Sequence, residues 1–116
     1  MKVKKVNSAD SVKMLQDDDF LLIDVRTAEE WYSCSAISLN KNDIVFLCLT
    51  QPDMSINPNF TENFKALKID LKKKLLFICK AGRRSGLAAE MCALLGYECY
   101  NITDGIETLN LAMIEF

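Results

Sequence analysis

The stretch that decides the fold is LLFICKAGRRSG, residues 75–86. Its apolar beginning ends on Cys79, a short loop with Gly82 follows, and the next residues are helix formers that are apolar almost all round. The pattern predicts a strand over Leu75–Cys79, a tight loop, and a buried helix over Arg84–Leu95. A thiol would therefore stand where a buried strand ends.

A cysteine at the end of a strand is often no more than a small buried apolar residue. Here, however, three cationic side chains lie close to Cys79 in the sequence, namely Lys80, Arg83 and Arg84. The following helix would also turn its positive end and its free backbone N–H groups toward the sulfur, and Gly82 permits the sharp turn that this requires. Positive charge and N–H donors favour the thiolate, which is the nucleophilic form, so we expect Cys79 to be reactive.

Residues 79–85, CKAGRRS, resemble the active-site loop Cys-x-x-Gly-x-Arg-Ser/Thr of the rhodanese family. Two further stretches resemble that family in the right order. Residues 22–26, LIDVR, followed by EEW at 29–31, are similar to its Asp-Val-Arg…Glu-Glu-aromatic motif. Residues within 94–105 are similar to its closing strand and turn, so the resemblance spans about Phe20 to Glu107.

The order of the expected elements predicts an α/β fold. Strands that alternate with helices form a parallel sheet with helices on both faces. The resemblance implies the same architecture, a rhodanese-like three-layer α/β/α arrangement around a central parallel sheet of about five strands. We expect residues 1–116 to form one such domain, because a chain of 116 residues has no room for a second core.

Apolar patterning and capping signals place the elements along the chain. Strands are predicted over Val3–Val6, Phe20–Val25, Ile44–Leu49, Leu75–Cys79 and Glu98–Ile102, and helices over Ala9–Gln16, Ala28–Ser33, Thr61–Lys68, Arg84–Leu95 and from Ile106 onward. Ser8 is the expected cap of the first helix, and Thr27 and Glu30 have the spacing of a capping box. A helix over Ile44–Leu49 is the alternative to the strand predicted there.

Composition excludes several classes of protein. The net charge of −2 offers no basic field for nucleic acid. The longest apolar run, Ile44–Leu49, is far shorter than the roughly 20 residues of a membrane span. Five cysteines without a Cys-x-x-Cys pair, together with the lack of histidine, predict neither a disulfide framework nor a metal site, and no cofactor is expected. No apolar stretch follows the basic start, so we expect a cytoplasmic protein.

The resemblance assigns roles within the loop. Cys79 would be the catalytic nucleophile, and the loop that binds substrate would comprise Lys80, Ala81, Gly82, Arg83, Arg84 and Ser85. Arg84 matches the arginine of the family motif, and its fork suits an oxyanion or a carboxylate near the loop. Lys80 and Arg83 occupy the variable positions where the family selects its substrate, and Ser85 can cap the helix or bind the loop.

Other residues are expected to support the site or the core. Asp24 and Arg26 would tie loops together beside the active strand. Core packing is predicted for Cys48, Cys92 and Cys99, and Trp31 and Tyr32 are expected to pack against the protein rather than to stack on substrate. Cys34 is either an incidental cysteine or a second thiol near the site. It lies in Ser33–Ile37, where the Gly-His segment of the family is missing.

The favoured hypothesis is a sulfurtransferase that moves sulfane sulfur through a Cys79 persulfide. Its expected partners are a small anionic donor such as thiosulfate and a thiol or cyanide acceptor, protein thiols included, with no nucleic acid or membrane. One alternative is a non-catalytic rhodanese-like module for binding or regulation. Another is a phosphatase or arsenate reductase, but those enzymes use Cys-x5-Arg, whereas four residues separate Cys79 from Arg84.

Overall fold

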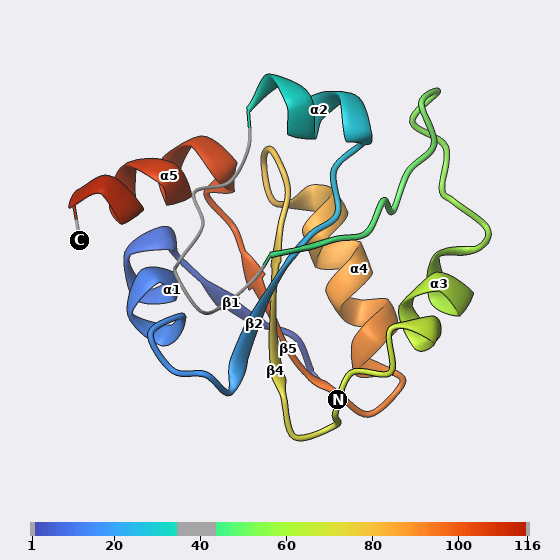
Figure 1. Cartoon of the computed structure of the whole chain (residues 1–116), viewed down its shortest axis with the longest axis horizontal. Coiled ribbons are helices and arrows are strands. Elements are labelled where there is room, and N and C mark those ends of the chain that lie inside the picture. Colours follow the sequence, from blue (N-terminus) through green and yellow to red (C-terminus); the bar gives the residue numbers. More distant parts are fainter. Residues whose placement is uncertain (1, 35–43, 116) are drawn as a thin grey trace.

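Five parallel strands form one sheet in the order β1-β5-β4-β2-β3 (Figure 1). The structure is a computed structural model that describes residues 2–34 and 44–115. The strands are β1 (Lys4–Val6), β2 (Phe20–Asp24), β3 (Val45–Phe46), β4 (Lys74–Ile78) and β5 (Glu98–Ile102). The helices are α1 (Ser8–Met14), α2 (Ala28–Ser33), α3 (Phe60–Ala66), α4 (Arg83–Ala93) and α5 (Gly105–Glu115).

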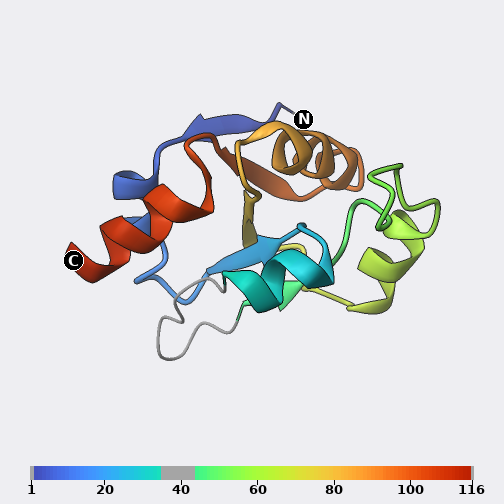
Figure 2. The same cartoon turned by 90° about the horizontal axis from the view of Figure 1, so that it is seen from above.

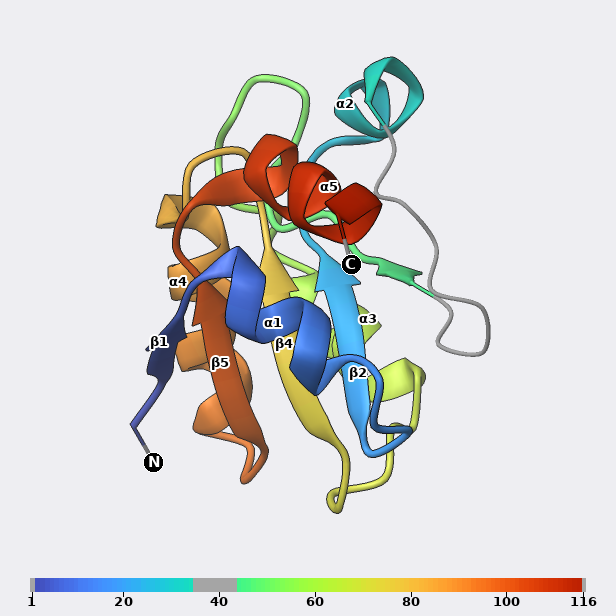
Figure 3. The same cartoon turned by 90° about the vertical axis from the view of Figure 1, so that its left-hand side faces the viewer.

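Helices cover both faces of the sheet, because β4 is apolar from Leu75 to Ile78 and sends alternate side chains to opposite faces. Leu75 and Phe77 are fully buried against α3 and α4, and Leu76 and Ile78 are fully buried against α1 and α5. Figure 3 shows α1 and α5 in front of the sheet and α4 behind it, and Figure 2 shows the layers from above. The three-layer α/β/α architecture predicted from the sequence is confirmed.

The strand order creates a switch point between β4 and β2. The chain leaves β2 toward β3 at one edge of the sheet, and it leaves β4 toward β5 on the opposite side. Two connections that diverge from neighbouring parallel strands leave a crevice at the carboxyl ends of those strands, where ligands of such sheets bind. The end of β4 is followed at once by Cys79, and β2 ends on Asp24.

The cap predicted for α2 is confirmed, whereas the cap predicted for α1 is wrong. Thr27 caps α2, and the reciprocal bonds between Thr27 and Glu30 form the predicted capping box. The predicted cap of α1 at Ser8 is wrong, because Asn7 holds that position and its side chain accepts the N–H of Asp10 at 2.8 Å. Ser8 instead donates its hydroxyl to Asp104, beside the start of α5.

The strand predicted over Ile44–Leu49 is shorter in the structure, where β3 covers Val45–Phe46. Beyond β3 the chain still donates backbone N–H groups to the end of β2, but it then turns back at Thr50, which bridges to Ile56 in antiparallel fashion. The turn draws the chain out of the sheet although Leu47 and Leu49 stay buried. This departure brings residues 49–56 beside the carboxyl end of β4.

Most of the divergent segment Ser33–Ile37 lies outside the described residues, which exclude 35–43. Among the helices that are described, none is long and apolar enough to cross a membrane.

Candidate active site

The thiol of Cys79 lies at the switch point and is held by groups of its own loop. Its Sγ atom accepts the backbone N–H of Gly82 at 3.0 Å and lies 3.2 Å from the hydroxyl of Ser85. The side chain is about 1% exposed. An N–H and a hydroxyl aimed at one sulfur atom are the donors that a thiolate or a persulfide anion needs.

The loop has this shape because of one left-handed residue at its end. Gly82 caps α4 with φ = +92°, a conformation that a side chain would strain. A Cβ atom at Gly82 would also lie 2.8 Å from the carbonyl oxygen of Thr103. The turn predicted at Gly82 is therefore confirmed, and it directs the Gly82 N–H back at Cys79.

The first residues of α5 clamp the loop from the other side. Gly105 approaches the loop so closely that a Cβ atom would stand 2.0 Å from the carbonyl oxygen of Lys80. The N–H of Ile106 donates to the carbonyl of Cys79 at 3.0 Å. The backbone carbonyls of Cys79 and Lys80 are thus fixed by a segment more than twenty residues further along the chain.

A buried asparagine of β5 anchors the loop through two groups. Asn101 donates its amide N–H to the carbonyl of Gly82 at 3.0 Å, which orients its amide oxygen toward Ser85. The Ser85 hydroxyl donates to that oxygen at 2.5 Å. Because a hydroxyl carries one proton, Ser85 can donate either to Asn101 or to a Cys79 thiolate, and a Cys79 thiol can donate to Ser85.

The arginine of the loop is paired with a carboxylate. Arg84 donates to both oxygens of Glu30, at 2.6 and 2.8 Å, so its fork binds a carboxylate near the loop, one of the two partners expected from the sequence. The pair joins the start of α4 to α2. The bond from Arg84 is the main reason that the pKa of Glu30 falls to about 2, against burial, and the N–H of Thr27 acts in the same direction. The same bond raises the pKa of Arg84.

Asp24 and Arg26 form a buried ion pair with N–O distance 2.8 Å at the end of β2. The Arg26 guanidinium also donates to the carbonyl of Cys34 at 2.7 Å and to that of Glu30 at 3.4 Å. Arg26 therefore links the end of β2 to the last turn of α2, which carries the partner of Arg84. We continue to assign this pair a supporting role.

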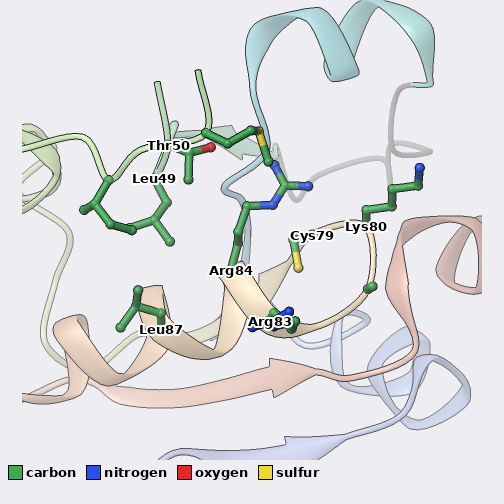
Figure 4. A pocket seen from close by; sticks show the side chains of 10 residues that line it. Leu49, Thr50, Cys79, Lys80, Arg83, Arg84 and Leu87 are labelled. Carbon is green, nitrogen blue, oxygen red and sulfur yellow. The ribbon is translucent and has the colours of Figure 1, made fainter. Parts of the chain in front are cut away.

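A cavity of about 510 Å³ opens beside the thiol (Figure 4). Its walls are formed by Leu49, Thr50, Met54, Ile56, Cys79, Lys80, Ala81, Arg83, Arg84 and Leu87. Figure 4 shows Leu49, Thr50 and Leu87 to one side of Cys79 and Lys80 to the other. A neighbouring cavity of about 490 Å³ is lined by α2 and by residues 48–54.

The structure places all seven predicted loop residues, Cys79 to Ser85, on the wall of the first cavity or at the sulfur. Ala81 lines the cavity together with the exposed cations Lys80 and Arg83, while Gly82 and Ser85 contact Cys79. Arg84 also lines the cavity, but its guanidinium is engaged by Glu30.

Core packing was predicted for Cys48, Cys92 and Cys99, and a packing role for Trp31 and Tyr32 of α2. Cys92 and Cys99 are buried as predicted, and burial raises the pKa of both thiols. The prediction of core packing for Cys48 is wrong: Cys48 is half-buried and lines the neighbouring cavity. Leu47 and Leu49 on either side of it point into the core, so Cys48 faces the opposite way in this extended segment. Trp31 packs on Phe46, whereas Tyr32 is exposed because adjacent residues of a helix face different directions. Cys34 is exposed.

Three residues that shape the site were not singled out in the sequence. Glu30 was noticed as part of a capping box, and its second role toward Arg84 had no local signal. Asn101 offered a weak signal, since a polar side chain within the apolar strand β5 requires a buried partner. Gly105 belonged to the stretch that resembles the closing turn of the family, but its contact with the loop had no local signal.

Fold and site together define a parallel α/β protein that presents a cysteine-bearing loop at the switch point of its sheet. The chain belongs to the family of the rhodanese-like domain, whose model matches residues 8–112.

Individual proteins and solved structures are similar to this chain. The chain is 40% identical over 116 residues to a Rickettsia prowazekii protein named "Uncharacterized protein RP600", covering 95% of this chain and 89% of that protein. The crystal structure of Rv0390 from M. tuberculosis has a TM-score of 0.77 at 25% identity, covering 90% of this chain and 80% of that one. The polysulfide-sulfur transferase of Wolinella succinogenes has a TM-score of 0.69 at 22% identity, with coverage of 91% and 72%, which shows a shared fold.

Proposed function

We propose that the protein is a sulfurtransferase that carries sulfane sulfur from a small anionic donor, such as thiosulfate, to a thiol or cyanide through a persulfide on Cys79. The observation that carries the proposal is the position of the Cys79 sulfur, which accepts the Gly82 N–H at 3.0 Å beside a cavity lined by Lys80 and Arg83. An anionic donor and a thiolate repel each other, so fixed positive charge and N–H donors are needed where they meet. The related fold of a polysulfide-sulfur transferase adds support by analogy.

The reaction has two steps that balance in atoms and charge. The Cys79 thiolate attacks the outer sulfur of thiosulfate, a bond forms between the two sulfur atoms, and sulfite leaves with the electron pair of the broken bond. An acceptor thiolate or cyanide then attacks the outer sulfur of the persulfide and releases the Cys79 thiolate. The N–H of Gly82 and the hydroxyl of Ser85 are the groups that would stabilise each sulfur anion.

The length of the loop favours sulfur over phosphate. Four residues separate Cys79 from Arg84, one fewer than in the phosphatase pattern, and Glu30 already occupies the guanidinium that would bind a phosphate. We therefore expect little hydrolysis of an aryl phosphate. We also assign the activity to a reducing compartment such as the cytoplasm, because all five cysteines are free.

The test is the intact mass of the protein after incubation with thiosulfate. The wild type should gain the mass of one sulfur atom and lose it again when cyanide is added. Cys79→Ser should show no gain, while Cys34→Ser, which changes an exposed thiol, should behave as the wild type does. The proposal fails if the wild type gains no sulfur from thiosulfate, mercaptopyruvate or a persulfide donor.

One feature favours a non-catalytic binding module as the second candidate. The bidentate contact with Glu30 removes Arg84 from the charges available to a donor, and the Cys79 side chain is about 1% exposed. Absence of the mass gain in a folded wild-type protein would support this candidate.

A further inference from the structure

The cavity beside Cys79 has two halves of different chemistry. One half is cationic, with Lys80 and Arg83 exposed on the loop. The other half is apolar and is built by Leu49, Met54, Ile56 and Leu87. Three of these four apolar side chains are more than two-fifths exposed to solvent, Met54 at 55%, Ile56 at 46% and Leu87 at 41%.

A sulfur donor such as thiosulfate does not need the apolar half of the cavity in order to bind. It is a small, strongly hydrated dianion, and the cations of the loop are sufficient to attract it. The cavity of about 510 Å³ is in the range that encloses ligands of drug size. The second substrate of a two-step transfer must reach the same sulfur atom, so the apolar half is available to the acceptor.

One residue of the apolar half, Met54, has an unfavourable backbone conformation. Met54 has φ = +70°, a left-handed conformation that glycine or asparagine adopts more easily. The turn around it is tied at both ends, since Met54 N–H donates to Gln51 and Gln51 N–H donates to Ser55, each at 2.8 Å. A long apolar side chain kept in a strained turn beside a reactive site points to a use for that side chain.

The charge of the cavity indicates what else the acceptor carries. Arg84 is neutralised by Glu30, whereas Lys80 and Arg83 are exposed. Lys80 lies on the opposite side of Cys79 from Leu49 and Leu87 (Figure 4). An acceptor with a carboxylate and an aliphatic body would place each group against a matching wall. The cavity is concave and of small-molecule size, which favours a small thiol over a protein surface.

We propose that the acceptor is a small thiol with an aliphatic body and a carboxylate, bound between the 49–56 segment and the loop cations. The proposal rests on the proposed function. The acceptor thiolate attacks the outer sulfur of the Cys79 persulfide, a new sulfur–sulfur bond forms on the acceptor, and the Cys79 thiolate leaves. The acceptor departs as its own persulfide, and no oxidant or reductant is needed.

The test compares acceptors on persulfide-loaded enzyme, with loss of the added sulfur followed by intact mass. The probes are the terminal thiol acids mercaptoacetate, mercaptopropionate, mercaptohexanoate and mercaptooctanoate, with mercaptohexanol as an uncharged comparison and cyanide as an acceptor without a body. Second-order rate constants should rise by up to about fourfold per buried methylene, which corresponds to about 0.8 kcal/mol each. Mercaptohexanoate should react faster than mercaptohexanol, and more so at low salt.

Variants of the apolar wall and of the cationic wall separate the contribution of the aliphatic body from that of the carboxylate. Met54→Gly should lower the ratio of the mercaptooctanoate to the cyanide rate constant by about tenfold, while the protein should be no less stable because glycine relieves the left-handed turn. Lys80→Gln should reduce the preference for the acid over the alcohol. Leu94→Gln is the matched control, because Leu94 is 83% exposed and lies outside the cavity, and it should change neither ratio.

The outcomes distinguish this inference from the proposed function. If no persulfide forms, the proposed function itself fails. If the persulfide forms and cyanide discharges it, but chain length has no effect or Met54→Gly leaves the ratio unchanged, the apolar site is overturned while the sulfurtransferase stands. Equal rates for the acid and the alcohol would remove the carboxylate from the proposal.

Discussion

Replacing Glu30 by glutamine should remove a part of the stability that depends on pH. Glu30 accepts both bonds of the Arg84 fork and the N–H of Thr27, and the Glu30 and Arg84 side chains are 26% and 16% exposed. Glutamine keeps the size of the side chain and one acceptor oxygen but loses the charge. The variant therefore tests the ion pair rather than the packing around it.

The magnitude follows from the lowered pKa of Glu30, which moves from 4.5 to about 2 chiefly through the Arg84 bond. Without solvent screening, this lowering of the pKa corresponds to about 3 kcal/mol of folding free energy. Water around the partly exposed pair reduces the contribution to about 1–2 kcal/mol. Because folding lowers the pKa, the contribution is present above pH 4.5 and is lost as the pH falls toward about 2. Glu30→Gln should accordingly lose about 1–2 kcal/mol near neutral pH and almost nothing near pH 2.

The assay is urea unfolding of the wild type and of Glu30→Gln across this pH range. Other carboxylates titrate in both proteins, so the difference between the two curves isolates the pair. Glu29→Gln is the matched control, because Glu29 lies on the same turn of α2 and is exposed. A difference that stays constant with pH, or an equal effect of Glu29→Gln, would refute the reasoning.

Three further variants test groups around the site, two that hold the loop and one in the 49–56 segment. Gly105→Ala should cost at least about 3 kcal/mol of unfolding free energy, because its Cβ atom would lie 2.0 Å from the carbonyl oxygen of Lys80. Gly96→Ala is the control and should cost about 1 kcal/mol, because Gly96 is also left-handed but its Cβ atom would lie 3.6 Å from the nearest atom. Similar urea midpoints for the two variants would show that the close approach of Gly105 does not fix the loop. Asn101→Ala should cost about 2 kcal/mol of unfolding free energy and slow persulfide formation, because the Ser85 hydroxyl and the Gly82 carbonyl lose their hydrogen-bond partner. An unchanged rate of mass gain would mean that these bonds do not serve the reaction. Thr50→Val should raise the unfolding free energy by about 1 kcal/mol, because the buried Thr50 hydroxyl has no hydrogen-bond partner among the described residues. A loss of stability would show that this hydroxyl forms a hydrogen bond in solution.

Local chemistry made the central prediction possible. The apolar run over 75–78, the thiol that follows it and the glycine that turns the chain are contiguous, so the strand, the loop and the helix could be predicted from adjacent residues. The capping box of Thr27 and Glu30 is confirmed for the same reason, because both partners lie within one helical turn.

The errors lie where a neighbour from elsewhere in the chain decides the outcome. Residues 44–49 are apolar enough for a strand, yet β3 ends at Phe46 because the chain turns back to pair Thr50 with Ile56. Cys48 faces a cavity rather than the core because Leu47 and Leu49 on either side of it take the core positions. Ser8 has the chemistry of a cap, but Asn7 before it and Asp104 from the far end of the chain determine its bonds.

The sequence by itself determined the family, the alternation of strands and helices, and the position of the cysteine-bearing loop, because these depend on residue types in short contiguous patterns. Only the tertiary structure decided which groups surround the thiol. Glu30 reaches Arg84 across 54 residues, and Asn101 reaches Ser85 across 16. These contacts exist because β4 lies between β2 and β5 in the sheet, and the order of parallel strands is set by how the helices pack on both faces rather than by any local pattern.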